Sequence, residues 1–200
     1  MTITEFLKLF KKRLWSQCSI LLLVRPGGKP IPTDMQKPCT GELRWATDEM
    51  LDDCLSFQTP EQVAQLKAIL KSGSRVHLGY IDGNCVYRHM LRFQGPVDFD
   101  GCIVYQLGPN EMITERSFCA PSARGHHFQQ KSLFEMFKAY PERTSYTEIR
   151  AENPASLLGA LRCGYEIRSL LTVKNRFFHR TLIQTPLSPE EAVRYHPDNL

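Results

Sequence analysis

Residues 118–137 read FCAPSARGHHFQQKSLFEMF, and this stretch decides the fold that we expect. Pro121 has no N–H to donate, so it predicts the end of a strand. Leu133, Phe134 and Phe137 recur at three- and four-residue spacing, which indicates an amphipathic helix. A strand that enters a helix through a short turn leaves backbone N–H groups without partners, and the helix dipole adds to their positive potential. The stretch therefore predicts a phosphate site.

A second stretch, residues 151–165, reads AENPASLLGALRCGY. Asn153 followed by Pro154 is typical of a helix start, and Cys163-Gly164 of a helix end. The pair resembles the two signature segments of the GNAT superfamily of N-acetyltransferases, whose first segment is a turn of the pattern Arg/Gln-x-x-Gly-x-Gly/Ala. The matching residues are Arg124 in the first segment and Asn153, Ser156, Gly164 and Tyr165 in the second.

The resemblance extends over roughly residues 41–183 and implies a fold, a reaction and a co-substrate. The fold is a mixed α/β one, with a mostly antiparallel central sheet and helices on both faces. The reaction is N-acyl transfer from acetyl-CoA or another acyl-CoA to an amine of a small molecule or a protein. Together with the strand and turn, the resemblance assigns donor binding to Phe118, Cys119, Ala120, Arg124, Gly125, His126, His127, Phe128, Gln129 and Asn153.

Two departures from the family pattern leave alternatives open. The turn carries His127 and Gln129 where the family has small residues, and Ala160 stands where the family often has a tyrosine that protonates the departing thiolate. One alternative is a non-catalytic binding or interaction module on the same fold. Another is an acyltransferase whose donor is acyl carrier protein, because that donor lacks the adenosine diphosphate that a glycine-rich turn would hold.

Acyl transfer to an amine also needs a base for the amine proton. In the predicted strand 111–119 neither alternating face is cleanly apolar, which fits a polar cleft, and Glu115 is the candidate base. A Glu115 that pairs with a neighbouring strand is the alternative interpretation. Glu148 on the next strand is a second candidate, whereas we interpret His89 as structural although an imidazole titrates in the right range.

His126 and His127 are adjacent and invite a metal interpretation. No partner spacing such as HExxH accompanies them, so we expect no metal. Their ring or backbone N–H groups would instead face phosphate. We interpret Tyr165 as core packing at a strand start, and Asn153 as a helix cap that can also bind the donor.

Composition and charge narrow the class of protein. The chain has 200 residues, of which 42% are hydrophobic and 23% charged, as in an ordinary globular protein. The net charge of +4 permits anionic ligands without indicating nucleic acid. The seven cysteines are scattered and include no CxxC pair, which favours reduced thiols and a cytoplasmic location.

The chain divides into a predicted N-terminal extension (1–40), a GNAT-like domain (41–183) and a tail with a short helix (184–200). One face of the first helix carries Ile3, Phe6, Leu7, Phe10 and Leu14, beside a basic cluster at 8–13. This helix would pack on the domain, lie on an anionic membrane surface, or dock an acidic carrier protein. A buried strand at 19–25 and a proline-rich loop at 26–40 follow. Pairing of edge strands in a homodimer stays open.

The remaining pattern predicts the order of elements. Capping boxes at Thr59 and Ser188 predict helix starts. Asp82-Gly83 predicts a hairpin turn, and residues 102–107 and 111–119 predict a second hairpin. The predicted strands are 42–45, 75–81, 85–93, 102–107, 111–119, 144–150, 169–174 and 176–183.

Overall fold

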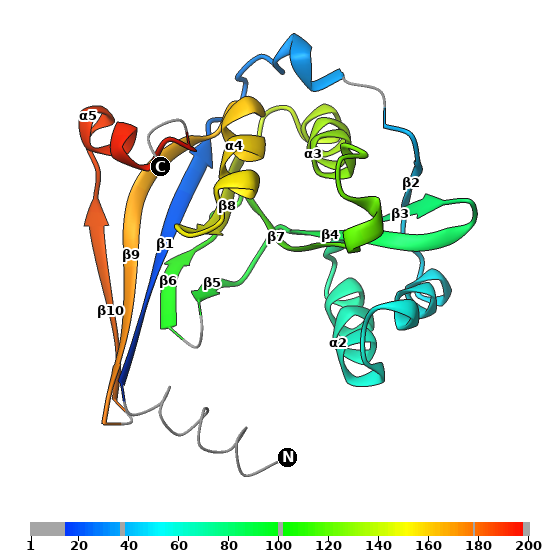
Figure 1. Ribbon diagram of the computed structural model, residues 1–200, viewed down its shortest axis with the longest axis horizontal. Helices are drawn as coiled ribbons and strands as arrows, with labels where there is room; N and C mark the ends of the chain where they lie inside the picture. Colours follow the sequence, from blue (N-terminus) through cyan, green and yellow to red (C-terminus); the bar gives the residue numbers. More distant parts are fainter. Residues whose placement is uncertain (1–14, 37–38, 100–101, 178, 198–200) are drawn as a thin grey trace.

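The computed structural model describes residues 15–36, 39–99, 102–177 and 179–197 (Figure 1). One sheet contains eight of the described strands: β1 (Trp15–Arg25), β2 (Glu42–Trp45), β3 (Arg75–Ile81), β4 (Asn84–Arg92), β7 (Glu111–Cys119), β8 (Thr144–Arg150), β9 (Glu166–Arg176) and β10 (His179–Pro186). Their order is β10-β9-β1-β8-β7-β4-β3-β2. A separate two-stranded sheet pairs β5 (Pro96–Phe99) with β6 (Cys102–Gln106).

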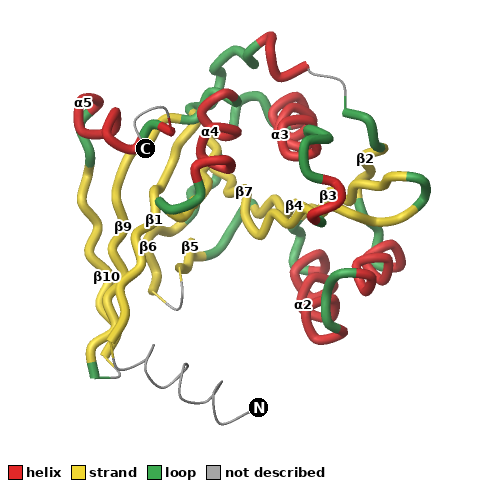
Figure 2. Tube along the Cα trace, in the orientation of Figure 1, coloured by secondary structure: helices red, strands yellow, loops and turns green. Residues whose placement is uncertain are grey.

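Most of the described helices lie between these strands along the chain, whereas the last two follow β10 (Figure 2). The α-helices are α2 (Pro60–Lys71), α3 (Phe128–Ala139), α4 (Pro154–Arg162) and α5 (Pro189–Ala192). The 3-10 turns are η1 (Thr33–Gln36), η2 (Glu49–Ser56), η3 (Pro121–Ala123) and η4 (Val193–Tyr195). Among the described strands β7 and β8 form the one parallel pair. The mixed α/β fold with a mostly antiparallel sheet is therefore confirmed.

The capping signals identify the helix starts. Thr59 and Ser188 both form complete capping boxes, and the Asn153 side chain accepts from the Ser156 N–H at 3.2 Å. These side chains satisfy amides that the first helical turn leaves without partners. In the described part of the chain, no helix is both long and apolar enough to cross a bilayer.

β1 lies inside the sheet, between β8 and β9. Its apolar residues Ile20–Val24 are all buried, as suits a strand that is covered on both faces. The strand predicted at 19–25 is confirmed and begins earlier, at Trp15. Residues 15–25, which the sequence placed in an extension, are thus hydrogen-bonded into the same sheet as the predicted domain. The predicted amphipathic helix at the N-terminus lies outside the described residues.

The two faces of the sheet have different covers (Figure 1). Helices α3 and α4 cover one face and pack Leu133, Phe137 and Leu157 against β1, β4 and β8. On the other face η2 and α2 cover β3 and β4, and the β5–β6 hairpin covers β1 and β9 through Val104. Any cleft through the sheet therefore opens toward α3 and α4 on one side and toward the hairpin on the other.

The hairpin predicted between residues 102–107 and 111–119 is wrong. β6 pairs with β5, and β7 pairs with β4 on one edge and with β8 on the other. Both hydrogen-bonding edges of β7 are thus occupied, so β6 cannot join it. The turn between them is local: the Glu111 carboxylate accepts from the Gly108 N–H at 2.7 Å.

A buried polar cluster joins α3 to the sheet. The Ser132 hydroxyl lies 2.9 Å from Nδ1 of His77 and 3.0 Å from Nδ1 of His89. Because one hydroxyl can donate only one proton, one imidazole accepts it and the other donates its Nδ1–H. Burial lowers the pKa of both imidazoles to about 3, so both are neutral at pH 7. The structural interpretation of His89 is consistent with these contacts.

Candidate active site

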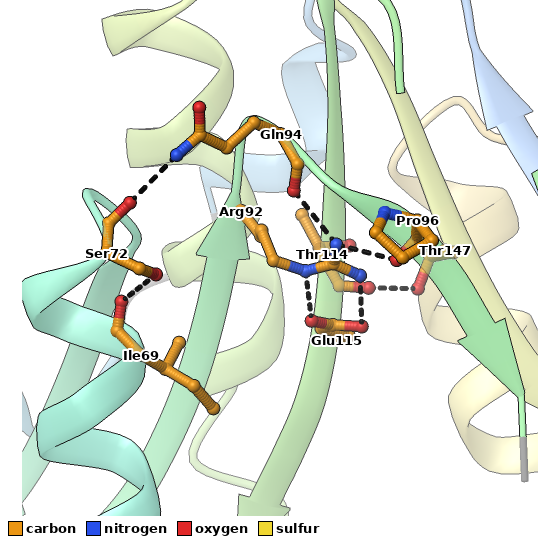
Figure 3. A network of polar contacts seen from close by, with 8 residues as sticks. All are labelled: Ile69, Ser72, Arg92, Gln94, Pro96, Thr114, Glu115 and Thr147. Atoms are coloured by element: carbon orange, nitrogen blue, oxygen red, sulfur yellow. Dashed lines mark hydrogen bonds and ion pairs between the residues drawn. The ribbon is translucent and has the colours of Figure 1, made fainter. Parts of the chain in front are cut away.

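The parallel strands β7 and β8 separate partway along their length. Their pairing runs from Glu111↔Thr144 to Thr114↔Thr147, although β7 continues to Cys119 and β8 to Arg150. The Thr147 hydroxyl donates to the Thr114 carbonyl at 3.0 Å and marks the last contact before the strands diverge (Figure 3). The resulting fork exposes main-chain groups that a fully paired sheet would use.

A β-bulge in β7 produces this divergence. The β4–β7 register shifts between Arg88 and Met90, and Arg116 adopts a φ of +51°. The Arg88 guanidinium donates to the Arg116 carbonyl and to Gln58 Oε1, which fixes the bulge in place. A bulge bends its strand and ends regular pairing. Beyond it, the Ala120 N–H donates to Val86 O at 2.8 Å, so alternation turns the main-chain groups of Cys119 toward the fork.

A cavity of about 630 Å³ lies between the end of β7, the N-terminus of α3 and helix α4. Helix α3 begins after Gly125, with a φ of +86°, and His127, with a φ of +60°. His127 makes no side-chain cap, so the N–H groups of the first turn keep their positive potential. Arg124 and Arg162 also line this cavity, which we name the donor cavity.

Most of the predicted donor-binding residues line the donor cavity. They are Phe118, Cys119, Arg124, Gly125, His127, Phe128, Gln129 and Asn153. Ala120 and His126 do not line it: the Ala120 N–H bonds β4, and the His126 ring contacts Thr40 Oγ1. A role for these two residues in donor binding remains a prediction without a contact that supports it.

Sequence reasoning missed the wall that α4 contributes. Ala155, Ser156, Gly159 and Arg162 line the cavity and recur at the helical spacing, so they share one face of α4. That periodicity was readable from the sequence once a helix was predicted to follow Asn153. Tyr87 of β4 also lines the cavity, and no local sequence signal places it there.

The two departures from the family pattern leave the donor cavity open. His127 is exposed, and its left-handed backbone costs about 1 kcal/mol relative to glycine. Gln129 reaches α4, because a Cβ added at Gly159 would lie 3.1 Å from its Oε1. Ala160 is buried, and the Tyr165 hydroxyl bonds Thr114 and Ser145 within the core. Tyr165 is therefore a packing residue, as predicted.

A second cavity of about 500 Å³ occupies the fork, and we name it the fork cavity. It shares Ser117, Gln129, Asn153 and Ser156 with the donor cavity. Its remaining lining comes from both faces of the sheet: His89, Asp98, Thr114, Glu115, Arg116, Leu133, Thr147, Glu148, Ile149, Arg150 and Ala160. The two cavities thus meet at the shared residues, and the fork cavity extends to the hairpin side of the sheet at Asp98.

Glu115 is paired with Arg92 (Figure 3). The guanidinium Nε lies 2.9 Å from Oε1 and Nη2 lies 3.4 Å from Oε2, and both side chains are largely buried. The same guanidinium donates to the carbonyls of Gln94 and Pro96 at the start of the hairpin. Glu115 therefore pairs with a neighbouring strand, as in the alternative interpretation, and its carboxylate already has a cationic partner.

Glu148 has a different environment. Its Oε1 is buried and has no hydrogen-bond partner among the described residues. Burial raises the pKa of Glu148 to about 7, with a further increase from the negative charge of Glu115. The described residues contain no group of three or more His, Cys, Asp or Glu side chains arranged to hold a metal.

Several solved structures resemble this chain in fold. No family model and no curated protein matches the chain. It is similar to a conserved Staphylococcus epidermidis protein of unknown function, with a TM-score of 0.58 and 10% identity, covering 94% of this chain and 69% of that one. A GNAT-family acetyltransferase from Colwellia psychrerythraea gives a TM-score of 0.54 at 14% identity, covering 92% and 62%.

A chain from Novosphingobium aromaticivorans that is assigned to the GNAT family gives a TM-score of 0.55 at 14% identity, covering 86% of this chain. The chain spans 66% and 62% of the length of these two GNAT chains. At such identities the likeness concerns the fold. The chain has the fold of these solved GNAT-family chains, as the two sequence segments predicted.

Proposed function

We propose that this protein is an N-acyltransferase that moves an acyl group from acyl-CoA to an amine. The observation that carries the proposal is the fork between β7 and β8, which opens beside the N-terminus of α3. A helix N-terminus and a gap in a sheet, beside two cavities that share Ser117, Gln129, Asn153 and Ser156, suit a long thioester donor. Acetyl is the simplest acyl group for this site.

The donor would extend through both cavities, with its diphosphate in the donor cavity and its thioester in the fork cavity. Its diphosphate would face the amides of Phe128 and Gln129 and the cations of Arg124 and Arg162, since helix N-termini and arginines bind phosphate. Its pantetheine arm would follow the main chain of Cys119 into the fork. The thioester would then lie near Ser117, where backbone N–H groups can stabilise an oxyanion. Such a site works mainly by positioning the reactants.

Acetyl-CoA is expected to raise the melting temperature of the wild type, because a ligand that binds the folded state stabilises it. Ser156→Trp places an indole at the junction of the two cavities and is expected to abolish the shift. Lys138→Trp, on the exposed last turn of α3, is the matched control and should keep it. The measurement is the melting temperature of the three proteins as a function of acetyl-CoA concentration. A wild-type protein whose melting temperature does not change would contradict the proposal.

Arg124 and Arg162 predict that the protein binds CoA thioesters more tightly than the pantetheine thioester that an acyl carrier protein would present. Acetyl-CoA should bind at least about tenfold more tightly than S-acetylpantetheine, because charge-assisted hydrogen bonds to phosphate contribute about 1.5–3 kcal/mol each. The double variant Arg124→Ala/Arg162→Ala should remove most of that difference. Calorimetric titration of both thioesters measures it. Equal affinities would favour acyl carrier protein as the donor, and binding of neither thioester would favour a non-catalytic module.

A further inference from the structure

We propose that Glu148 is the general base that accepts the proton of the acceptor amine, and that Arg92 excludes Glu115 from this role. The proposal rests on the N-acyltransferase function proposed above. It adds the identity of the base and the side of the sheet from which the acceptor arrives.

Glu115 and Glu148 occupy equivalent places on the two branches of the fork. Thr114↔Thr147 is the last parallel pair, so each carboxylate belongs to the first residue beyond it on its own strand. Both side chains line the fork cavity. A nucleophile held between the branches would therefore lie within reach of either carboxylate, and what distinguishes the two is their partners.

Glu148 faces the hairpin side of the sheet. Tyr146, two residues earlier on β8, packs with Val97 and Ile113 beneath the hairpin, and alternation puts Glu148 on the same face. Ile149 packs on the opposite face with the residues of α3 and α4. The donor cavity lies on the α3 and α4 side, so the base and the donor approach the fork from opposite faces.

The partners of the two carboxylates decide which one can take a proton. Two nitrogens of the Arg92 guanidinium hold the Glu115 carboxylate, so a proton or an ammonium group would have to displace this contact. Oε1 of Glu148 is buried and has no partner in the described part of the chain, so a proton or an ammonium group can reach it without breaking a contact seen there. Of the two carboxylates, Glu148 is therefore the one whose buried oxygen is available to receive a proton in the fork cavity.

Charged groups from three other strands act on Glu148: Arg92 from β4, Asp98 from β5 and Glu115 from β7. Arg116, Arg150 and the neutral His89 also line the fork cavity. Burial is the largest cause of its raised pKa of about 7; Glu115 and Asp98 raise it further and Arg92 lowers it. Glu148 is then largely ionised just above neutral pH, where a general base is most effective.

Amide formation joins one acceptor amine to the acyl group of one thioester and releases the CoA thiol and one proton. The ammonium form of the acceptor gives one proton to the Glu148 carboxylate and becomes a neutral amine. Its nitrogen forms a bond to the thioester carbonyl carbon, and the C–S bond breaks with its electron pair on sulfur. The second nitrogen proton passes to the thiolate, which gives the CoA thiol and an amide. Glu148 returns its proton to water.

The test measures thiol release from acetyl-CoA with ethylamine as the probe amine between pH 5.5 and 9. The wild type should show a rate that rises with pH through about 7. Glu148→Gln should lose about 10²–10⁴-fold in kcat and lose this rising limb, with an unchanged KM for acetyl-CoA. Glu148→Asp should recover part of the rate. Glu115→Gln should move the rise of the rate to lower pH, because it removes a negative neighbour of Glu148 and frees Arg92 to stabilise the Glu148 carboxylate.

A Glu148→Gln variant that keeps the wild-type rate and its pH dependence overturns the proposal. So does a wild type that releases thiol no faster than the uncatalysed reaction. The acetyl-CoA thermal shift, measured on the same samples, separates the failures. A shift without a role for Glu148 leaves the donor site standing, and the absence of a shift removes the acyltransferase function itself. Because glutamine removes a buried charge, Glu148→Gln should fold at pH 8 at least as stably as the wild type.

Discussion

Gly79→Val is expected to lower the free energy of unfolding by about 3 kcal/mol and to weaken acetyl-CoA binding in the molecules that still fold. A Cβ at Gly79 would lie 2.7 Å from two ring carbons of Phe128 and 2.9 Å from the Cβ of Tyr87. Phe128 is buried, stacks on Tyr87 with 5.4 Å between ring centroids, and is the first residue of α3. Displacing its ring therefore displaces the helix N-terminus that faces the donor.

Urea unfolding and calorimetric titration with acetyl-CoA measure the two effects. The double variant Gly79→Val/Phe128→Leu serves as the control, since leucine vacates part of the space that valine needs. The two substitutions should be less than additive in stability. A Gly79→Val protein with wild-type stability and affinity would show that Phe128 does not set the position of α3.

Acid is expected to unfold the protein, with the histidine cluster as the main cause. The folded-state pKa of His77 and His89 is about 3, below the unfolded value of 6.5. Between these values the unfolded state binds more protons than the folded state. The contribution of the two neutral imidazoles to the free energy of unfolding is therefore fully present above pH 6.5 and is lost as the pH falls toward 3. Each imidazole accounts for up to about 5 kcal/mol by pH 3, which is comparable to the whole stability of many domains.

Urea unfolding at pH 7, 5.5 and 4.5 tests this dependence. His77→Asn should be less stable than the wild type at pH 7 but should lose less stability on acidification, whereas the exposed-site control His179→Gln should follow the wild type. Glu148 acts in the opposite direction between pH 4.5 and about 7, because its pKa is raised, so the series is best repeated with Glu148→Gln. Equal pH dependence in His77→Asn and the wild type would exclude the cluster as the cause.

Local patterns predicted much of the fold because their causes are local. The capping boxes at Thr59 and Ser188, the Asn153 cap and the strand at 42–45 depend on residues within a few positions of one another. For the same reason, the stretch at 118–137 was enough to predict many of the residues that line the donor cavity. The turn itself is longer than predicted, since η3 and the left-handed His127 precede helix α3.

Long-range pairing was not predictable from these patterns. Nothing in the composition of 15–25 says that the strand lies between β8 and β9, because an apolar run fits any covered position in a sheet. The partner of β6 depended on β7 having both edges occupied. Likewise, alternation along β7 suggested Glu115 as the base, but only the structure shows that Arg92 of β4 already holds it.

A crystal structure of the protein with bound acetyl-CoA tests the central claim most directly. The account predicts that diphosphate oxygens accept hydrogen bonds from the main-chain N–H groups at the start of α3, near Phe128 and Gln129, and that the thioester lies in the fork beside Ser117. Density for the diphosphate elsewhere, with the His127 imidazole filling the turn after Gly125, would contradict it.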